Sequence, residues 1–342
     1  MKGDIRMYLE NGYLDIGRAM DKGQVLNIII GGRGTGKTYG AIKWCIENGK
    51  RFVLMRRTRE QAELISKPEF SPIIPVLNDL GIEYTLNKKL GHGMTGIELD
   101  EKLFAVVIGL TGISNLRGFS ASWVDVIIFD EFIGERHERP IKNEDAAFFN
   151  AYETLNRNRE LEGRDPIRVM MLANANQISS VYLSALGIMP QIERMLKKGI
   201  PEYINPKRGI YLLIMKSSPI SARKQNTALY KFTNAAFNDM AISNEFSISG
   251  KEFIRPQNTL SLQPLFAWGN LHFYKIKGSR NWYVNQKRLG NFDKTFTDDK
   301  RGEDAFLLSD LYDDFEIAHL NGRVYYEDLM TLNEINVRLN HA

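Results

Sequence analysis

The sequence predicts an α/β protein, in which a mainly parallel β-sheet covered by helices is followed by a smaller α+β domain. Residues 24–215 alternate short apolar runs with helix-like stretches, and several of these runs lack the polar alternation of a half-exposed strand. After about residue 228 the chain becomes aromatic-rich and alternating. A length of 342 residues also fits two domains, since one domain takes roughly 100–200 residues.

The predicted elements of the first domain follow one another in regular order. The expected strands are Val25–Ile30, Phe52–Met55, Leu103–Leu110, Val124–Phe129, Arg168–Leu172 and Tyr211–Met215. The helices expected between them are Lys37–Ile46, Arg59–Ile65, Asp145–Arg159 and Gln191–Lys197.

Changes in composition divide the chain into three parts. Residues 1–215 form the first domain, and residues 216–245 form a linker that contains the polar stretch KSSPISARKQ and an expected helix, Thr227–Met240. Residues 246–342 form the α+β domain, with alternating segments Phe246–Ile254, Leu265–Ile276 and Trp282–Gln286. The turn Lys277-Gly-Ser279 predicts a hairpin between the last two segments.

Composition excludes several classes of protein. The single cysteine, Cys45, permits no internal disulfide, and the five histidines show no zinc-binding spacing. No apolar run approaches the ~18 residues of a membrane span, and the N-terminus is charged rather than signal-like. The net charge of +4 permits a polyanionic partner without demonstrating one. We therefore expect a soluble, cytoplasmic protein without structural metal.

A phosphate-binding loop follows the first expected strand. The stretch GGRGTGKT, Gly31–Thr38, fits the P-loop pattern G-x-x-x-x-G-K-[ST]. In a P-loop the backbone N–H groups surround phosphate oxygens, the lysine reaches the β- and γ-phosphates, and the hydroxyl ligates Mg²⁺. The residues predicted to bind ATP in this way are Gly31, Gly32, Arg33, Gly34, Thr35, Gly36, Lys37 and Thr38.

A second motif indicates the reaction. The strand VDVIIFDE ends in Asp130 and Glu131. Asp130 has the place of a Walker B carboxylate that holds Mg²⁺ together with Thr38, and Glu131 can orient and polarise an attacking water. Two solvated acids at a strand end are the simpler alternative, but they do not account for the P-loop upstream. No DxxG switch follows, so ATP hydrolysis is favoured over GTPase chemistry.

Further polar residues are candidates for contacts to the phosphates. Asn174, at the end of the strand RVMMLAN, is placed to sense the γ-phosphate, although alone it would be interpreted as a turn or cap residue. Arg56 follows the second strand, Arg117 precedes Walker B, and Arg157 follows the expected helix. Most surface arginines are merely solvated or paired with acids, but a phosphate-directed arginine accelerates hydrolysis roughly a thousandfold.

These motifs together resemble the genome-packaging ATPase of small tailed phages, the phi29-like podovirus group. In chain order they are GGRGTGKT, LMRRTRE, SNLRG, VIIFDEF, LNRNRE and LANAN. The resemblance covers about residues 20–180, and more distantly it extends to the ATPase half of large terminases. Its most specific parts are FDEF, RNRE and the arginine pair after the second strand.

The resemblance implies a RecA-like ATPase domain of the additional-strand (ASCE) class, a short linker domain and a C-terminal domain. Such proteins form a homomeric ring, usually pentameric, on the portal vertex of an empty capsid and drive double-stranded DNA inward, some with a structural RNA. The implied trans-acting arginine finger is Arg157, and a second basic residue acting between subunits is Arg117. The implied location is the cytoplasm of the infected host, transiently on the procapsid.

The resemblance also implies a C-terminal domain similar to a degenerate RNase H-like nuclease. A two-metal nuclease needs convergent carboxylates, one of them on its first long strand, and Leu265–Ile276 has none. We expect no nuclease activity. The aromatic segment 273–288 carries Lys275, Lys277 and Arg280, which are candidates for contact with DNA, RNA or the portal, or are charges that protect a sheet edge.

Two other functions stay open on the sequence alone. One is a P-loop ATPase that acts as a switch or partner-loading module, and the other is an ATP-dependent helicase. Stimulation by a protein partner but not by DNA would favour the switch, and strand displacement on a forked duplex would favour the helicase. The isolated chain could be monomeric, because ring assembly could require the capsid.

Overall fold

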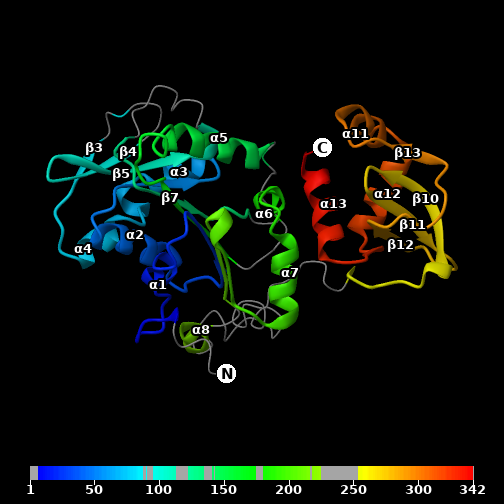
Figure 1. Ribbon diagram of the computed structural model, residues 1–342, viewed down its shortest axis with the longest axis horizontal. Coiled ribbons are helices and arrows are strands. Elements are labelled where there is room, and N and C mark those ends of the chain that lie inside the picture. The colour runs from blue at the N-terminus through cyan, green and yellow to red at the C-terminus, as the bar shows by residue number, and fades with distance from the viewer. Residues whose placement is uncertain are drawn as a thin grey trace. The chain divides into compact units, whose positions relative to one another are not determined.

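The computed structural model describes residues 7–87, 90, 95–112, 122–134, 141, 143–174, 180–215, 218–224 and 253–341 (Figure 1). The chain divides into two compact units. The first comprises residues 1–139, 143–177 and 194–246, and the second comprises residues 140–142, 178–193 and 247–342. These units differ from the predicted division at residues 215 and 246 in that residues 178–193 group with the second unit and residues 194–246 with the first.

The first unit is built on a nine-stranded sheet in the order β3-β4-β5-β2-β6-β7-β1-β9-β8. Its strands are β1 (Leu26–Gly31), β2 (Phe52–Arg56), β3 (Thr85–Asn87), β4 (Thr95–Leu99), β5 (Lys102–Gly109), β6 (Val126–Asp130), β7 (Arg168–Asn174), β8 (Glu202–Asn205) and β9 (Ile210–Ile214). Its helices are α1 (Ile16–Met20), α2 (Lys37–Glu47), α3 (Arg59–Ile65), α4 (Ile74–Asp79), α5 (Glu144–Asn156) and α8 (Pro219–Lys224). The unit boundary falls within α7 (Met189–Lys198).

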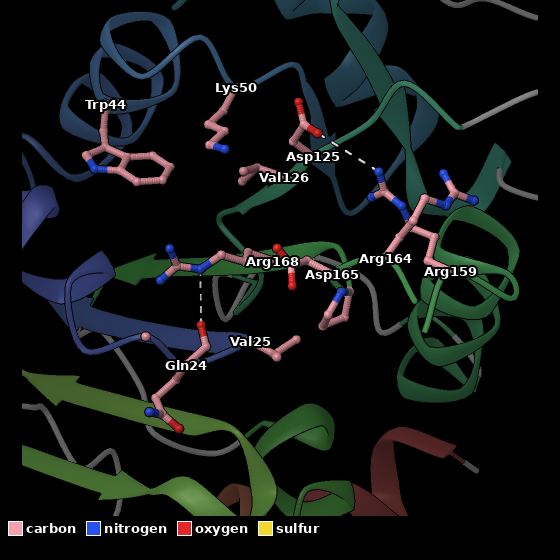
Figure 2. A pocket seen from close by; sticks show the side chains of 12 residues that line it. Gln24, Val25, Trp44, Lys50, Asp125, Val126, Arg159, Arg164, Asp165 and Arg168 are labelled. Atoms are coloured by element: carbon pink, nitrogen blue, oxygen red, sulfur yellow. Dashed lines mark hydrogen bonds and ion pairs between the residues drawn. The ribbon is translucent and has the colours of Figure 1, made fainter. Parts of the chain in front are cut away.

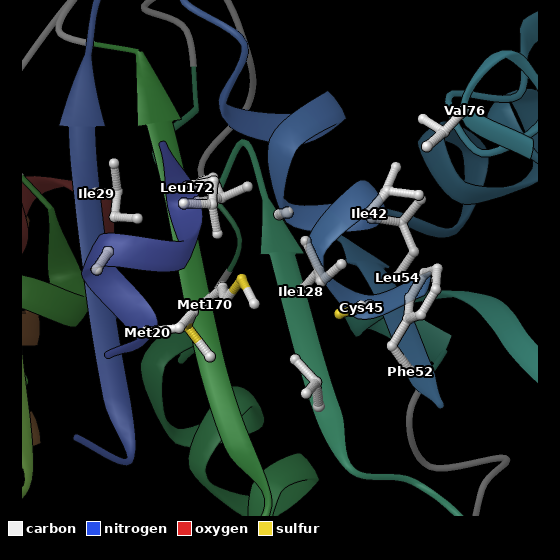
Figure 3. Packing of buried hydrophobic residues seen from close by; sticks show 14 of the residues in the cluster. Met20, Ile29, Ile42, Cys45, Phe52, Leu54, Val76, Ile128, Met170 and Leu172 are labelled. Carbon is white, nitrogen blue, oxygen red and sulfur yellow. The ribbon is translucent and has the colours of Figure 1, made fainter. Parts of the chain in front are cut away.

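Six neighbouring strands of the sheet run parallel to one another: β5, β2, β6, β7, β1 and β9. At the edges, β4 pairs antiparallel with β5, β3 pairs antiparallel with β4, and β8 pairs antiparallel with β9. Both faces of the parallel strands are buried. On one face, residues such as Ile29, Leu54 and Met170 pack against Ile42 and Cys45 of α2 (Figure 3). On the other, Phe129 stacks on Phe148 of α5, with ring centroids 5.1 Å apart. Two-sided burial explains why these strands are apolar without alternation.

All six predicted strands and four predicted helices of this region are present, α3 with the predicted ends and the others with shifted ends. The helix expected at Asp145–Arg159 stops at Asn156, because Arg157 takes a backbone φ of +47° that ends helical geometry. Three edge strands were not predicted, since β3 and β8 are very short and β4 has little apolar alternation. The expected helix Thr227–Met240 lies outside the described residues, as does most of the linker.

The second unit contains a five-stranded sheet in the order β13-β10-β11-β12-β14. Its strands are β10 (Leu262–Trp268), β11 (Leu271–Ile276), β12 (Trp282–Asn285), β13 (Lys294–Phe296) and β14 (Val324–Tyr326), and its helices are α6 (Val181–Ala185), α11 (Lys300–Leu307), α12 (Asp310–Leu320) and α13 (Leu329–His341). The segment expected as Leu265–Ile276 is two antiparallel strands, because Gly269, with φ +58°, turns the chain. The hairpin at Lys277–Ser279 is confirmed.

Aromatic rings hold this second sheet to its helices. Phe273 of β11 stacks on Phe266 of β10, and it meets Phe315 of α12 edge to face. Residues 178–193 belong here because Asn333 of α13 accepts the backbone N–H of Ser180 at 3.1 Å and donates to Ser184 of α6. The described helices of both units include none that is long and apolar enough to cross a bilayer.

Candidate active site

The carboxyl ends of β1, β6 and β7 meet at one edge of the nine-stranded sheet. A cavity of about 570 Å³ opens there, lined by the P-loop, by Asp130 at the end of β6 and the following Glu131, and by Asn174 at the end of β7. Parallel strands bring their carboxyl ends to the same edge, so residues distant in sequence converge. The structure thus places three of the predicted motifs around a single cavity.

The loop between β1 and α2 depends on its glycines. Gly34 and Gly36 have φ of +65° and +85°, a region that other residues rarely occupy. At Gly36 a Cβ would also lie 2.9 Å from the ring of Tyr13, so the N-terminal segment packs directly on the loop. Helix α2 begins at Lys37, which turns its N-terminus toward the cavity and favours a bound anion.

Lys37 is held in place by hydrogen bonds to the loop and to Asn174. Its Nζ donates to the carbonyl oxygens of Gly31 at 3.0 Å and Gly32 at 2.7 Å, and to Oδ1 of Asn174 at 3.2 Å. The side chain is only 7% exposed. Asn174 is therefore in contact with the P-loop lysine, as a residue that senses the γ-phosphate would need to be.

The acidic residues form a network with Thr38 and Arg56. Thr38 Oγ1 donates to Asp130 Oδ1 at 3.0 Å, and Arg56 Nη2 lies 2.8 Å from Asp130 Oδ2. A second nitrogen of Arg56 pairs with Glu131. Burial raises the pKa of Asp130, and the Arg56 charge opposes that rise. Arg56, which we expected to contact ATP, thus lies against both carboxylates.

These residues fit a magnesium site. Mg²⁺ prefers oxygen ligands, and the Thr38 hydroxyl and the Asp130 carboxylate already lie within hydrogen-bond distance beside the phosphate loop. Glu131 is half exposed and has a φ of +55°. Such backbone strain in a residue other than glycine concentrates at functional sites.

The predicted arginines are placed differently. Arg157 is exposed at the end of α5, where its Nε donates to the carbonyl of Thr154 at 3.3 Å, and it is not among the described residues that line the cavity. Arg117 lies outside the described residues. The geometry therefore gives Arg157 no role within its own nucleotide cavity.

Two features of the site were not predicted. Arg57, next to Arg56, is buried and makes a bidentate pair with Glu144 at the start of α5, with N–O distances of 2.6 and 3.0 Å. Tyr39 lines the nucleotide cavity, and its hydroxyl donates to Asp79 at 2.8 Å. The arginine pair in the sequence pointed to this region, but nothing local identified Glu144 as its partner.

The basic residues of the second unit lie along the β11–β12 hairpin. Lys275 Nζ lies 5.1 Å from the centre of the Trp282 ring, and Lys277 donates to the carbonyl of Leu260 at 3.2 Å. Arg280 is exposed in the turn that follows. The three charges are close in sequence and partly or fully open to solvent, but their aromatic and carbonyl contacts also serve the hairpin itself.

Comparison with known proteins decides the family. Residues 11–266 match the podovirus DNA encapsidation protein (Gp16) family. The chain belongs to this family. Two of its relatives are the DNA packaging proteins of Bacillus phages B103 and phi29, which are 29% and 25% identical over 241 residues. That alignment spans 69% of this chain and 68% and 66% of the two relatives.

Solved structures of encapsidation motors share the fold. The Phi-28 gp11 DNA packaging motor aligns over 96% of this chain and 97% of its own, with a TM-score of 0.63 and 16% identity. The bacteriophage Phi-29 genome packaging motor assembly aligns over 96% and 98%, with a TM-score of 0.60 and 19% identity. The podovirus resemblance predicted from the motifs is confirmed.

Proposed function

We propose that this encapsidation-family protein hydrolyses ATP and uses the energy to drive double-stranded viral DNA through a portal into a preformed capsid. The observation that carries the proposal is the convergence of Lys37, Thr38, Asp130 and Glu131 on one cavity in a chain of this family. Fold alone would not support a reaction, but these residues provide the parts that phosphoryl transfer to water requires.

Each residue at the cavity has a distinct task. The P-loop N–H groups and Lys37 bind the phosphates, and Thr38 with Asp130 would hold Mg²⁺, which neutralises charge on the transferred phosphate. Glu131 orients and polarises the water. Arg56 pairs with Glu131 and so fixes the position of that carboxylate beside the cavity.

The arginine finger comes from a neighbouring subunit in this proposal. Arg157 is exposed and is not among the described residues that line its own cavity, which supports a role at the cavity of the next subunit in a ring. Arg117 is proposed to act at the same interface. The ring is expected to be a pentamer when assembled on the capsid vertex.

We assign the first unit to the RecA-like additional-strand (ASCE) class because β7 lies between the P-loop strand β1 and the acidic strand β6. The second unit is proposed to be a degenerate RNase H-like domain without nuclease activity. Strands β10 and β11 carry no acid, and the acids of residues 299–314 lie on or beside α11 and α12.

The expected partners follow from the function. The motor grips duplex DNA through phosphates without reading sequence, and it works on the procapsid in the host cytoplasm. The Lys275, Lys277 and Arg280 surface is proposed to contact DNA, the portal or a structural RNA.

The deciding experiment is steady-state ATP hydrolysis by the full chain, with and without duplex DNA, with Glu131→Gln as the blank. Stimulation by duplex DNA that disappears in the variant is the expected result. Stimulation by a protein partner but not by DNA would instead favour an ATPase switch, and unwinding of a forked duplex would favour a helicase. Absence of hydrolysis under every condition, including on portal-bearing procapsids, would overturn the proposal.

A further inference from the structure

A second cavity lies at the opposite end of the strands that form the nucleotide site. It has a volume of about 470 Å³ and is bordered by Val25 before β1, Val126 at the start of β6 and Arg168 at the start of β7 (Figure 2). Trp44 of α2 forms one wall. No residue that lines the nucleotide cavity also lines this one.

The lining of this amino-end cavity is strongly basic. Four cationic side chains and two acidic ones surround it, which leaves a net charge of two positive. The cations are Lys50, Arg159, Arg164 and Arg168, and the acids are Asp125 and Asp165. Arg164 also pairs with Glu162, at 2.6 Å, but the other cations still outnumber the acids of the lining, and an excess of positive charge attracts an anion.

The two central guanidinium groups are held mainly by neutral oxygens. Arg159 Nη1 donates to the carbonyl of Val124 at 2.6 Å, and Arg168 Nε donates to the carbonyl of Gln24 at 3.3 Å. The nearest carboxylate oxygen paired with Arg159, Asp125 Oδ1, is 3.9 Å from Nη2. The buried Nε of Arg159 has no hydrogen-bond partner among the described residues.

Arg57 provides the contrast within the same unit. Arg57 and Arg159 are 6% and 8% exposed. Arg57 is neutralised by two short bonds to Glu144, whereas no carboxylate in the described part of the chain pairs with Arg159 in this bidentate way. Burying a charge without a matching counter-charge is costly, so the arrangement at Arg159 is suited to an anion that comes from outside the unit.

We propose that the amino-end cavity binds a phosphate group. Guanidinium groups match the geometry of phosphate oxygens, and the cavity is large enough for a phosphate together with part of the molecule that bears it. The phosphate belongs either to a free ion or to the backbone of a nucleic acid. This site is separate from the nucleotide site and does not depend on the assignment of the motor.

The test uses inorganic phosphate as the probe and calorimetry on the full chain. Lys37→Ala removes the P-loop contribution, and Lys50→Ala/Arg164→Ala removes two exposed cations of the cavity while the buried Arg159 stays in place. We expect the double change to weaken phosphate binding by at least tenfold. The matched control is Lys67→Ala/Arg301→Ala, two exposed cations that line neither cavity, and it should bind as the parent does.

Two further measurements make the result decisive. With the P-loop intact, calorimetry should count two phosphates per chain in the parent and one in Lys50→Ala/Arg164→Ala. Phosphate should also change the tryptophan fluorescence of the parent, and Trp44→Phe should abolish that change while calorimetric binding remains. Equal affinity and equal stoichiometry in the pocket variant and the control would overturn the proposal.

Binding of a short DNA duplex distinguishes a free phosphate ion from a backbone phosphate as the ligand of the cavity. If the cavity takes a backbone phosphate, the pocket variant will lower the salt dependence of duplex binding, and inorganic phosphate will compete with the duplex. If it takes a free ion, the variant will lose phosphate while duplex affinity and its salt dependence stay at the parent value.

Discussion

The two sheets of this protein both bury an apolar core, but they differ at the ends of their strands. In the nine-stranded sheet, β6 and β7 end in Asp130 and Asn174, which line one cavity, and β2 ends in Arg56, which pairs with Asp130. In the five-stranded sheet, β10 and β11 end in Trp268 and Ile276. Parallel neighbours send their carboxyl ends to one edge, whereas antiparallel neighbours send them to opposite edges. Strand direction therefore decides where polar residues can collect.

The largest effect on ATP turnover is expected from the proposed arginine finger, Arg157, which follows α5 in the unit with the parallel sheet. Arg157→Ala should lower ATP turnover roughly a thousandfold, because it removes a cation from the transferring phosphate. If the finger acts in trans, mixing Arg157→Ala subunits with Lys37→Ala subunits in assembled rings will restore turnover, since the second supplies the arginine that the first lacks. Turnover that stays low at every mixing ratio would place Arg157 outside this role.

Glu131→Gln tests the strand end itself. Removing the carboxylate that polarises water should lower kcat by about a hundredfold or more while ATP binding stays near the parent value. Glu162→Gln, on an exposed loop, is the matched control and should leave kcat unchanged. Parent-level turnover in Glu131→Gln would remove Glu131 as the group that activates water.

The buried pair behind the active-site edge should matter for stability. Glu144→Gln leaves the Arg57 charge without its partner, and we expect a loss of about 3 kcal/mol in the free energy of opening α5. Hydrogen exchange of the α5 amides measures this directly. Glu153→Gln, on the exposed side of the same helix, is the control, and equal protection in both variants would show that the pair contributes nothing.

Changes to the second sheet should alter the affinity for nucleic acid rather than the rate of ATP hydrolysis. Neutralising Lys275, Lys277 and Arg280 should reduce the slope of log affinity against log salt by about 0.9 for each phosphate that the hairpin no longer neutralises. The comparison variant removes Lys294, Lys300 and Arg301 from the same unit. If both variants give the parent slope, the hairpin does not bind phosphates.

The smallest expected effect is a difference in acid sensitivity between the two units. Burial lowers the pKa of His272 and His319 in the second unit. The unfolded chain then takes up protons first as the pH falls below about 6.5, so the stability of this unit should decrease from there downward. Thermal unfolding followed at pH 7 and pH 5 in the parent and in His319→Phe checks the sign. A second unit that becomes more stable at pH 5 would contradict it.

Much of the first unit could be predicted because its signals are local. A run of apolar residues predicts a strand buried on both faces. The type and spacing of the polar residues near its end, such as Lys37 and Asp130, indicate the chemistry of the site. The fold class and the cavity-lining P-loop and acidic residues followed from these patterns. Arg117 lies outside the described residues, so its predicted role stays a prediction.

The features that could not be predicted from the sequence depend on contacts between distant residues or on backbone geometry. Arg57 and Glu144 are 87 positions apart, and no local pattern pairs them. The positive φ of Glu131 and of Arg157 is set by the surrounding fold, because neither residue prefers that conformation. The basic cavity combines residues from 23 to 168 that meet only once the sheet has formed.

Helix α5 joins two of these features in one rigid body. Its 13 residues make a rod of about 20 Å, with Glu144 clamped to Arg57 at one end and Arg157 at the other. Arg57 is the neighbour of Arg56, which touches both carboxylates of the nucleotide site. A helix does not compress, so a displacement at Arg57 reaches Arg157 almost undiminished. In the proposed ring, we expect this helix to couple the nucleotide site of one subunit to the position of its own Arg157.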